Sequence, residues 1–321
     1  MLDLSKERIV LTGGAGFLGN WVQKELLGRG VGPENLLVPL IEDYDLTKEA
    51  DVVRMYEEMR PTVVIHLAAE VGGIGANGRN PGRFFYANMA MGLHLIENAR
   101  KRDIKKFLQV GTICSYPKLT PVPFKEENLW NGYPEETNAP YGIAKKALLV
   151  MLQAYRAQYG LNGIYLLPVN LYGPGDNFDP ETSHVITALI RKFCDAAENH
   201  LPEVTVWGTG SAGREFLYVE DAARGVVLAA QAYEGGEPVN LGAGFEIAIK
   251  DLACKIKELT GFQGNLVWDR TKPDGQPRRC LDTSRAKEYF GFSAQVGFDR
   301  GLKNTIEWWK SRQICDLSAI R

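Results

Sequence analysis

The stretch RIVLTGGAGFLGNWVQKELLGRG, residues 8–30, limits the fold more than any other part of the chain. Residues 8–12 favour a strand, and the later part of the stretch has the apolar spacing of a helix. Between them, Gly13, Gly16 and Gly19 allow a tight turn and a close approach of the backbone to a pyrophosphate, whose charge a helix N-terminus favours. This pattern predicts a dinucleotide-binding unit, with a plain packing turn as the alternative. No GK[ST] sequence closes the turn, which excludes a Walker loop.

Strand and helix patterns then alternate, which predicts parallel strands joined by helical crossovers. The expected strands are residues 8–12, 35–40, 62–69, 106–112 and 163–170, and the expected helices after the first are residues 48–59, 84–100 and 141–159. The fold class is therefore α/β with a doubly wound, parallel Rossmann-type sheet. A helix near residues 185–197 and a strand at residues 204–208 indicate a smaller, interleaved C-terminal substrate lobe. The expected domains are residues 1–171 with 216–240 for the dinucleotide, and residues 172–215 with 241–321 for the substrate.

Composition narrows the class of protein. The 321 residues are 45% hydrophobic and 24% charged with a net charge of −2, which is typical of a globular protein and argues against nucleic acid as the main partner. Five scattered cysteines without CxxC or Cys/His ligand spacing argue against a disulfide framework or a zinc site, and no metal is expected. No leader-like segment and no apolar run of about 18 residues is visible, so we expect a cytoplasmic protein without membrane contact.

The end of the second expected strand bears on the choice of nicotinamide cofactor. Glu42 and Asp43 are acidic and no Arg or Lys lies between residues 35 and 46, so the residues alone favour NAD. Ordinary strand and loop packing is the alternative here and at the end of the third strand. The expected cofactor-binding residues are Gly13, Gly16, Phe17, Leu18, Gly19, Asp45, Leu46, Leu67, Ala68, Ala69 and Pro168, together with Tyr141 and Lys145.

A tyrosine and a lysine at helical spacing form a candidate acid–base pair. Tyr141 and Lys145 are four residues apart, so a helix places the phenol and the ammonium group on one face. A nearby cation lowers the pKa of a tyrosine, which suits a proton donor to a carbonyl that is being reduced. Thr112, at the end of the preceding strand, would add a hydroxyl to the same carbonyl oxygen. A surface Tyr/Lys pair and a structural threonine are the alternatives.

Together with TGGAGFLG and HLAA, these residues resemble the extended short-chain dehydrogenase/reductase family. Longer segments resemble the GDP-L-fucose synthases of that family over nearly the whole chain: VGGIGANGRNP, GTICSYPK, NLYGPGDNFDPETSHVI, WGTGSAGREFLYVED and KPDGQPRR. The resemblance implies epimerisation at C3 and C5 of GDP-4-keto-6-deoxy-mannose and reduction of its C4 ketone with NADPH to give GDP-L-fucose. It also implies a homodimer paired through the helices at residues 84–100 and 141–159.

The resemblance assigns roles to further residues. Cys114 and His184 match the acid/base pair that moves protons at C3 and C5, and a thiol and an imidazole both titrate near neutral pH when tuned. Thr112 and Tyr141 would hold the C4 oxygen, and Lys145 would tune Tyr141. The implied substrate-binding residues are Asn170, His184, Lys192, Trp207, Arg214 and Lys272. Without the resemblance, Cys114 and His184 are an ordinary buried thiol and a solvated histidine.

Two departures from the family pattern keep alternatives open. Ala15 and the apolar residues 39–41 stand where some members carry arginines that bind the 2′-phosphate, so NADP is expected with NAD as the alternative. The segment GTICSYP stands for the more familiar GSSCIYP, so the pocket can differ. We therefore keep a related epimerase or reductase of another 4-keto sugar, for example a heptose, and a non-catalytic nucleotide-binding scaffold as alternatives.

Overall fold

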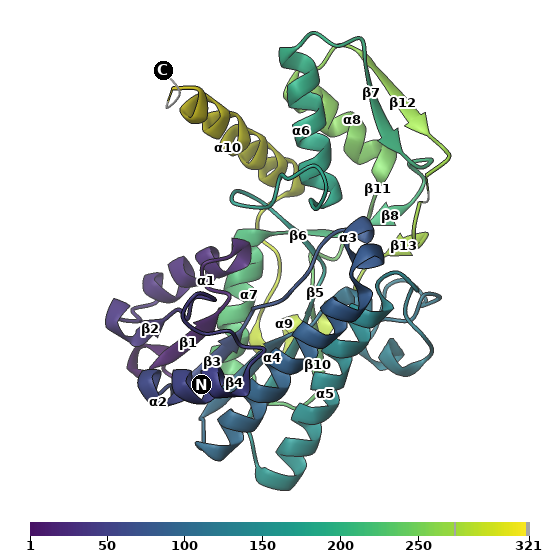
Figure 1. Ribbon diagram of the computed structural model, residues 1–321. Coiled ribbons are helices and arrows are strands. Elements are labelled where there is room, and N and C mark those ends of the chain that lie inside the picture. Colours follow the sequence, from purple (N-terminus) through teal and green to yellow (C-terminus); the bar gives the residue numbers. More distant parts are fainter. Residues whose placement is uncertain (273, 319–321) are drawn as a thin grey trace.

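A six-stranded sheet lies at the centre of the larger lobe of the computed structural model, which describes residues 1–272 and 274–318. Its strands are β1 (Ile9–Thr12), β2 (Leu36–Leu37), β3 (Val63–His66), β4 (Lys106–Val110), β5 (Gly163–Pro168) and β10 (Pro238–Leu241), in the order β10-β5-β4-β3-β1-β2 (Figure 1). All neighbouring strands are parallel. Every residue of β1, β3 and β4 is buried, because helices cover both faces of such a sheet.

Helices connect these strands as crossovers. They are α1 (Phe17–Gly28), α2 (Glu49–Met59), α3 (Ile74–Arg79), α4 (Pro81–Lys101), α5 (Ala139–Tyr159) and α7 (Val219–Ala232). The lobe also contains four short 3-10 helices: η1 (Leu4–Lys6) before β1, η2 (Pro33–Asn35), η3 (Ile113–Ser115) and η4 (Glu126–Trp130). α1 packs against α7, whereas α4 packs against α5 and α2. Their apolar sides and the sheet form the first of two large cores, which contains Val64, Leu95 and Leu166. The predicted doubly wound α/β fold is confirmed.

The smaller lobe has an apolar core of its own and lies above the sheet in Figure 1. Its elements are α6 (Val185–Glu198), β7 (Glu203–Trp207), β8 (Gly213–Arg214), β11 (Ile247–Ala248), α8 (Ile249–Thr260), β12 (Asn265–Asp269), β13 (Arg278–Arg279) and α10 (Phe298–Ser318). Ile190, Phe193 and Ile256 are buried in this core. Between the lobes, β6 (Asn170–Tyr172) pairs in parallel with β9 (Phe216–Tyr218).

β3 ends at His66, three residues before its expected end, and two other strands differ from their expected bounds in ways that bear on the site. β2 is much shorter than the expected residues 35–40, because Pro39 has no N–H to donate and the strand lies at the edge of the sheet. The strand expected at residues 163–170 is divided, since β5 ends at Pro168 and the separate strand β6 begins at Asn170. The first of these changes leaves the end of β2 as a loop, and the second takes the chain out of the sheet toward the smaller lobe.

The segment at residues 281–292 packs with the large sheet, although the expected division places it in the substrate lobe. α9 (Ser284–Phe290) contacts β10 and α7. Leu281, Phe290 and Phe292 belong to the first core, where they cover the outermost part of the sheet beside β10. No helix in the described part of the chain combines the length and the apolar character that a bilayer crossing needs.

Candidate active site

The glycine turn between β1 and α1 is packed too closely for side chains. Gly13 has a φ of 69°, and a Cβ there would lie 2.7 Å from the Ala68 nitrogen, just beyond β3. A Cβ at Gly19 would lie 2.1 Å from the Gly13 carbonyl oxygen. Gly16 precedes α1 and provides no side-chain cap, so the first N–H groups of the helix are available to a phosphate. This cradle fits the pyrophosphate of a dinucleotide.

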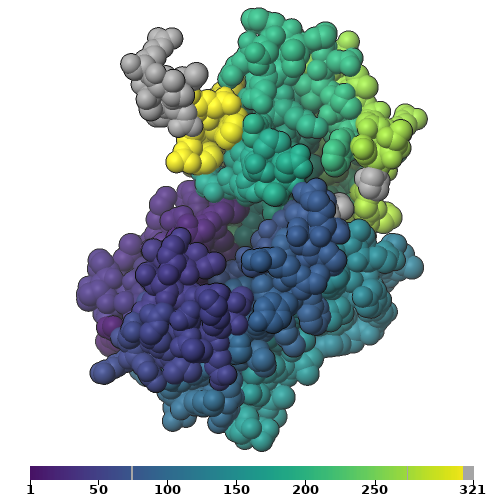
Figure 2. Space-filling model, viewed as in Figure 1, coloured from purple at the N-terminus to yellow at the C-terminus, as the bar shows by residue number. Residues whose placement is uncertain are grey.

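The other predicted cofactor-binding residues lie along the same edge of the sheet. Phe17 and Leu18 begin α1, Leu67, Ala68 and Ala69 follow β3, Pro168 ends β5, and Leu46 is buried in the loop before α2. The carboxyl ends of parallel strands share one edge, where nucleotides bind. The surface is hollowed where the purple N-terminal part, the blue segment around α3 and the teal smaller lobe meet (Figure 2).

The loop after β2 is organised around Asp45. Its carboxylate accepts hydrogen bonds from the Thr47 nitrogen at 3.1 Å and hydroxyl at 2.7 Å, and the hydroxyl bond is the main reason that the pKa of Asp45 is lowered. Arg54 of α2 lies over the Tyr44 ring, 4.5 Å from its centre. A basic side chain therefore reaches the loop after β2 from a helix, although residues 35–46 contain none.

α5 and the short helix η3 bring hydroxyl and thiol groups together. A Cβ at Gly142 would lie 2.3 Å from the Cys114 carbonyl oxygen, so α5 packs directly on η3. Ser115 Oγ donates to the Gly142 carbonyl at 2.9 Å and holds this contact. Cys114 packs against the cluster that contains Tyr141, and Thr112 lies close enough to Tyr141 to lower the pKa of its phenol. Three predicted catalytic residues thus meet at one point.

Burial sets the protonation of Tyr141 and Lys145. Loss of water raises the pKa of the Tyr141 phenol, the nearby Cys114 raises it further, and the hydrogen bond with Thr112 opposes both effects. Burial also lowers the pKa of the Lys145 ammonium group to about 7. The prediction that Lys145 lowers the pKa of Tyr141 is wrong for this structure, because burial dominates the phenol. Tyr141 therefore keeps its proton at neutral pH, as a proton donor must.

Two arginines of the smaller lobe face this point. Arg279 on β13 directs Nη1 to the Cys114 sulfur at 3.8 Å, and its Nε donates to Gln276 Oε1 at 2.8 Å. Arg214 on the neighbouring strand β8 donates to the Asp274 carbonyl at 3.1 Å (Figure 1). Burial and then the charge of Arg279 lower the pKa of Arg214 to about 10. A bound diphosphate would balance the charges of two guanidinium groups on paired strands.

Three predicted substrate-binding residues lie together on the smaller lobe. Trp207 at the end of β7 is 64% exposed, and the Nζ atoms of Lys192 and Lys272 lie 5.8 and 5.4 Å from its ring centre. Lys192 also donates to the Thr205 carbonyl at 3.1 Å, and burial lowers its pKa. An exposed indole can stack on a nucleobase, and the two ammonium groups near its ring can contact phosphate.

His184 is the residue before α6, and the loop that carries it contacts α3 near the site. The Gly73 nitrogen donates to the Thr182 carbonyl at 3.4 Å, which ties the His184 loop to the start of α3, the helix beside Tyr141. The imidazole keeps a solvent-exposed surface, and the protein atoms around it lower its pKa by displacing water. Among the described contacts, none joins the side chains of His184 and Cys114 directly.

The loop between β6 and α6 buries a carboxyl group beside the glycine turn. Asp176 Oδ1 accepts from the Asn177 nitrogen at 2.7 Å, whereas Oδ2 is buried without a partner among the described residues. Burial raises the pKa of Asp176 to about 7. Trp21 of α1 donates to the Pro174 carbonyl at 3.0 Å and holds the loop in place. Asn170, at the start of β6, donates its side-chain amide to the backbone just before β9 at 3.3 Å.

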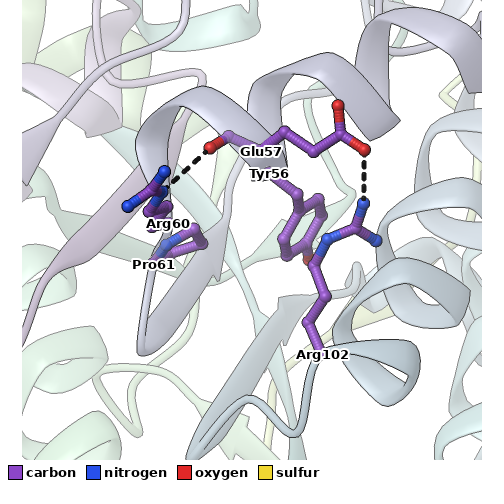
Figure 3. Close-up of a pocket in the computed structure, with 5 residues that line it drawn as sticks. All are labelled: Tyr56, Glu57, Arg60, Pro61 and Arg102. Atoms are coloured by element: carbon purple, nitrogen blue, oxygen red, sulfur yellow. Dashed lines mark hydrogen bonds and ion pairs between the residues drawn. The ribbon is translucent and has the colours of Figure 1, made fainter.

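A cavity of about 410 Å³ lies elsewhere in the larger lobe. Its lining residues are Tyr56, Glu57, Arg60, Pro61 and Arg102, at the ends of α2 and α4 (Figure 3). The chain passes from there into the N-terminal end of β3, whereas nucleotides bind at the carboxyl ends of parallel strands. This cavity is therefore separate from the candidate site.

Comparison with known proteins agrees with this geometry. Residues 9–242 match the NAD dependent epimerase/dehydratase family. The chain belongs to this family. A member from Oryza sativa subsp. japonica, named probable GDP-L-fucose synthase 1, is 42% identical over 303 residues, which are 94% of this chain and 92% of the relative. The resemblance to GDP-L-fucose synthases is confirmed.

Solved structures extend the likeness to both lobes of this epimerase/dehydratase. A GDP-6-OMe-4-keto-L-xylo-heptose reductase from C. jejuni has a TM-score of 0.90 at 28% identity, with 96% of this chain and 99% of that chain covered. A GDP-L-fucose synthetase from Naegleria fowleri bound to NADP has a TM-score of 0.86 at 28% identity, with 95% and 94% covered. The arrangement of both lobes is thus shared with nucleotide-sugar enzymes.

Sequence reasoning missed three side chains of this epimerase/dehydratase that belong near the site. Arg279 lies in KPDGQPRR, a segment with three basic residues of which the resemblance indicates only Lys272; the two further arginines were the signal that could have drawn attention to it. Arg54 comes from a helix and Asp176 from an irregular loop. Neither has a spacing relative to a motif that would single it out.

Proposed function

We propose that this protein converts GDP-4-keto-6-deoxy-mannose to GDP-L-fucose, first inverting C3 and C5 and then reducing the C4 ketone with a nicotinamide cofactor. The observation that carries the proposal is the meeting of Cys114 and Tyr141 with Arg279 of the smaller lobe. It places a proton donor, a thiol and a cation at one point, as ketone chemistry on an anionic substrate requires. The similarity to a plant GDP-L-fucose synthase over most of both chains supports this substrate.

NADP is the proposed cofactor. Gly13, Gly16 and Gly19 would hold its pyrophosphate against the uncapped start of α1. Arg54, beside the loop that follows β2, is the candidate partner of the 2′-phosphate, and the NADP in the Naegleria fowleri structure supports this choice over NAD. When bound, the cofactor supplies the two electrons and the hydrogen that reduce the ketone.

Epimerisation would begin at the carbons beside the ketone, whose protons are acidic because an enolate can form. Thr112 and Tyr141 would donate hydrogen bonds to the C4 oxygen and stabilise its negative charge. Cys114 would remove the carbon proton, and His184 would return a proton on the opposite face. The loop that precedes α6 would carry His184 to the sugar.

Reduction would then use the protonated form of Tyr141. The phenol, which burial keeps protonated, would give its proton to the C4 oxygen. Lys145, whose pKa burial lowers to about 7, would then supply a proton to the phenolate that remains after the transfer.

The nucleotide would lie across the smaller lobe. Trp207 would stack on the base, and Lys192 and Lys272 beside it would contact phosphate oxygens. Arg214 would bind the diphosphate next to the sugar, and Asn170 would help to position the sugar between the lobes.

A second candidate function is reduction or epimerisation of another GDP-linked 4-keto sugar, such as a heptose. The match with the C. jejuni heptose reductase favours this alternative. The same acid–base residues would serve, so the sugar itself must be tested.

We also propose a cytoplasmic homodimer paired through α4 and α5. Phe85, Tyr86 and Leu93 of α4 and Val150 of α5 expose large apolar side chains. Side chains of this kind on neighbouring helices are typical of a protein interface. Free thiols such as those of Cys114 and Cys254 stay reduced in the cytoplasm.

The proposal is tested with GDP-4-keto-6-deoxy-mannose in D₂O, with NADPH and NADH in parallel, by following cofactor absorbance and deuterium in the product. We expect NADPH oxidation with label at C3 and C5. Cys114→Ser should reduce labelling more than reduction of an already epimerised substrate. Label without oxidation would mean an epimerase, and neither signal would reject this substrate, after which a GDP-linked 4-keto heptose is tested in the same way.

A further inference from the structure

The Cys114 sulfur contacts the charged side chain of Arg279, which hydrogen bonds hold in place. Arg279 Nη1 lies 3.8 Å from the sulfur. Arg279 Nε donates to Gln276 Oε1 at 2.8 Å, and Gln276 is buried and donates from Nε2 to the Lys118 carbonyl at 2.7 Å. The guanidinium group is therefore aimed at the thiol by a fixed partner, because the amide of Gln276 cannot turn without losing both bonds.

The other charged groups near the sulfur reinforce a positive environment. Arg214 on β8 is close enough to interact electrostatically with both Arg279 and Cys114. The carboxylates on this side have partners of their own, since Asp274 accepts from Thr209 and Glu246 pairs with Arg278. From α5, the neutral phenol of Tyr141 faces the sulfur. Cations beside a partly exposed sulfur favour the thiolate, which is the basic and nucleophilic form.

We propose that Arg279 is a positioning residue that pairs with the Cys114 sulfur and stabilises negative charge on it. The use of this thiolate as a carbon base rests on the proposed function. In that step the sulfur takes the proton from the carbon beside the ketone, the C–H electron pair passes into the enolate, and Cys114 becomes a thiol. The charge pairing itself needs no substrate, so it can be measured on the free protein.

The experiment measures alkylation of Cys114 by iodoacetamide over a range of pH, with peptide mass spectrometry to resolve each cysteine. Cys254 is exposed and serves as the reference thiol within the same chain. Arg279→Gln is expected to slow Cys114 alkylation about tenfold relative to Cys254 at neutral pH. Arg279→Lys, which keeps the charge, is expected to stay within about threefold of the wild type.

Arg278→Gln is the matched control. Arg278 is the preceding arginine, is largely exposed and pairs with Glu246 instead of facing the sulfur. This control should keep the Cys114 rate within about twofold of the wild type, and circular dichroism melting should show that each variant is folded. A wild-type Cys114 profile in Arg279→Gln would overturn the proposal. Equal slowing in Arg279→Gln and Arg279→Lys would also overturn it, because charge would then not be the cause.

Failure of the proposed function gives a different pattern. If alkylation of Cys114 depends on Arg279 but no deuterium enters the product from D₂O, the charge pairing stands and the role of Cys114 as a carbon base is rejected. A protein that labels C3 and C5 but alkylates Cys114 independently of Arg279 would keep the function and reject the charge pairing.

Discussion

Replacing Lys145 with methionine should stabilise the fold at neutral and acidic pH while removing activity. The side chain is 2% exposed, and burial lowers the pKa of its ammonium group from 10.5 to about 7. Below about pH 7 the folded and unfolded chains both carry the proton, so the folded wild type bears the full cost of the buried charge. Between about pH 7 and 10.5 the unfolded chain binds more protons, so the stability of the wild type rises with pH through this window.

The magnitude follows from the width of that window. An interval from about 7 to 10.5, at 1.36 kcal/mol for each pH unit, corresponds to about 5 kcal/mol in the free energy of unfolding. This is an upper figure, since local relaxation and water entry reduce the cost of a buried ion. Methionine has a similar length and no charge, so Lys145→Met should gain most of this energy at about pH 6 and almost none at about pH 10.5.

Urea unfolding of both proteins at about pH 6, 8.5 and 10.5 tests this reasoning. The difference between the two unfolding free energies should fall steadily as the pH rises, and titrations common to both proteins cancel in that difference. A difference that is independent of pH, or a variant that is less stable than the wild type at about pH 6, would refute the argument. If the stabilised variant also loses ketone reduction, the wild type keeps Lys145 for activity at the expense of stability.

Tyr141→Phe should lower ketone reduction at least about a hundredfold and leave NADPH affinity within about threefold by fluorescence titration; unchanged turnover would remove Tyr141 as the acid. Gly19→Ala places a Cβ 2.1 Å from the Gly13 oxygen and should weaken NADPH binding at least about tenfold. Gly28→Ala, with nothing within 4 Å of its added Cβ, is the control in the same helix and should bind normally. Tyr86→Glu, on the exposed face of α4, should shift sedimentation from dimer to monomer, and a wild-type profile would place any interface elsewhere.

The core of the larger lobe could be predicted because its signals are local. The runs at β1 and β3 are largely apolar on both faces, and β4 is apolar apart from Lys106 and Gln109; glycines or polar turns separate these runs from amphipathic helices. The edge of the sheet was harder to predict, because β2 is short and Pro39 interrupts its pairing. The smaller lobe was harder still, since strands such as β8 and β13 pair only through contacts between distant segments.

The candidate site divides in the same way. Thr112, Cys114 and Tyr141 lie on segments whose spacing and resemblance select them, and the structure brings these segments together. The sequence could not distinguish Arg279 from the adjacent Arg278 or single out Asp176, because their importance depends on what lies opposite them in space. The error over the pKa of Tyr141 has the same origin: helical spacing gives its distance from Lys145, whereas burial depends on the whole fold.

One buried carboxylate explains how distant arginines share a site. Glu215 directly follows Arg214, and its side chain accepts backbone hydrogen bonds from Ala243 at 2.6 Å, just after β10, and from Leu281 at 2.6 Å, just after β13. Burial raises the pKa of Glu215 while these backbone donors oppose the rise. The same group thus fixes β8, the end of the central sheet and the segment that carries Arg279 relative to one another. The cations of the smaller lobe face Cys114 because this carboxylate, which has no part in the proposed chemistry, determines where both strands lie.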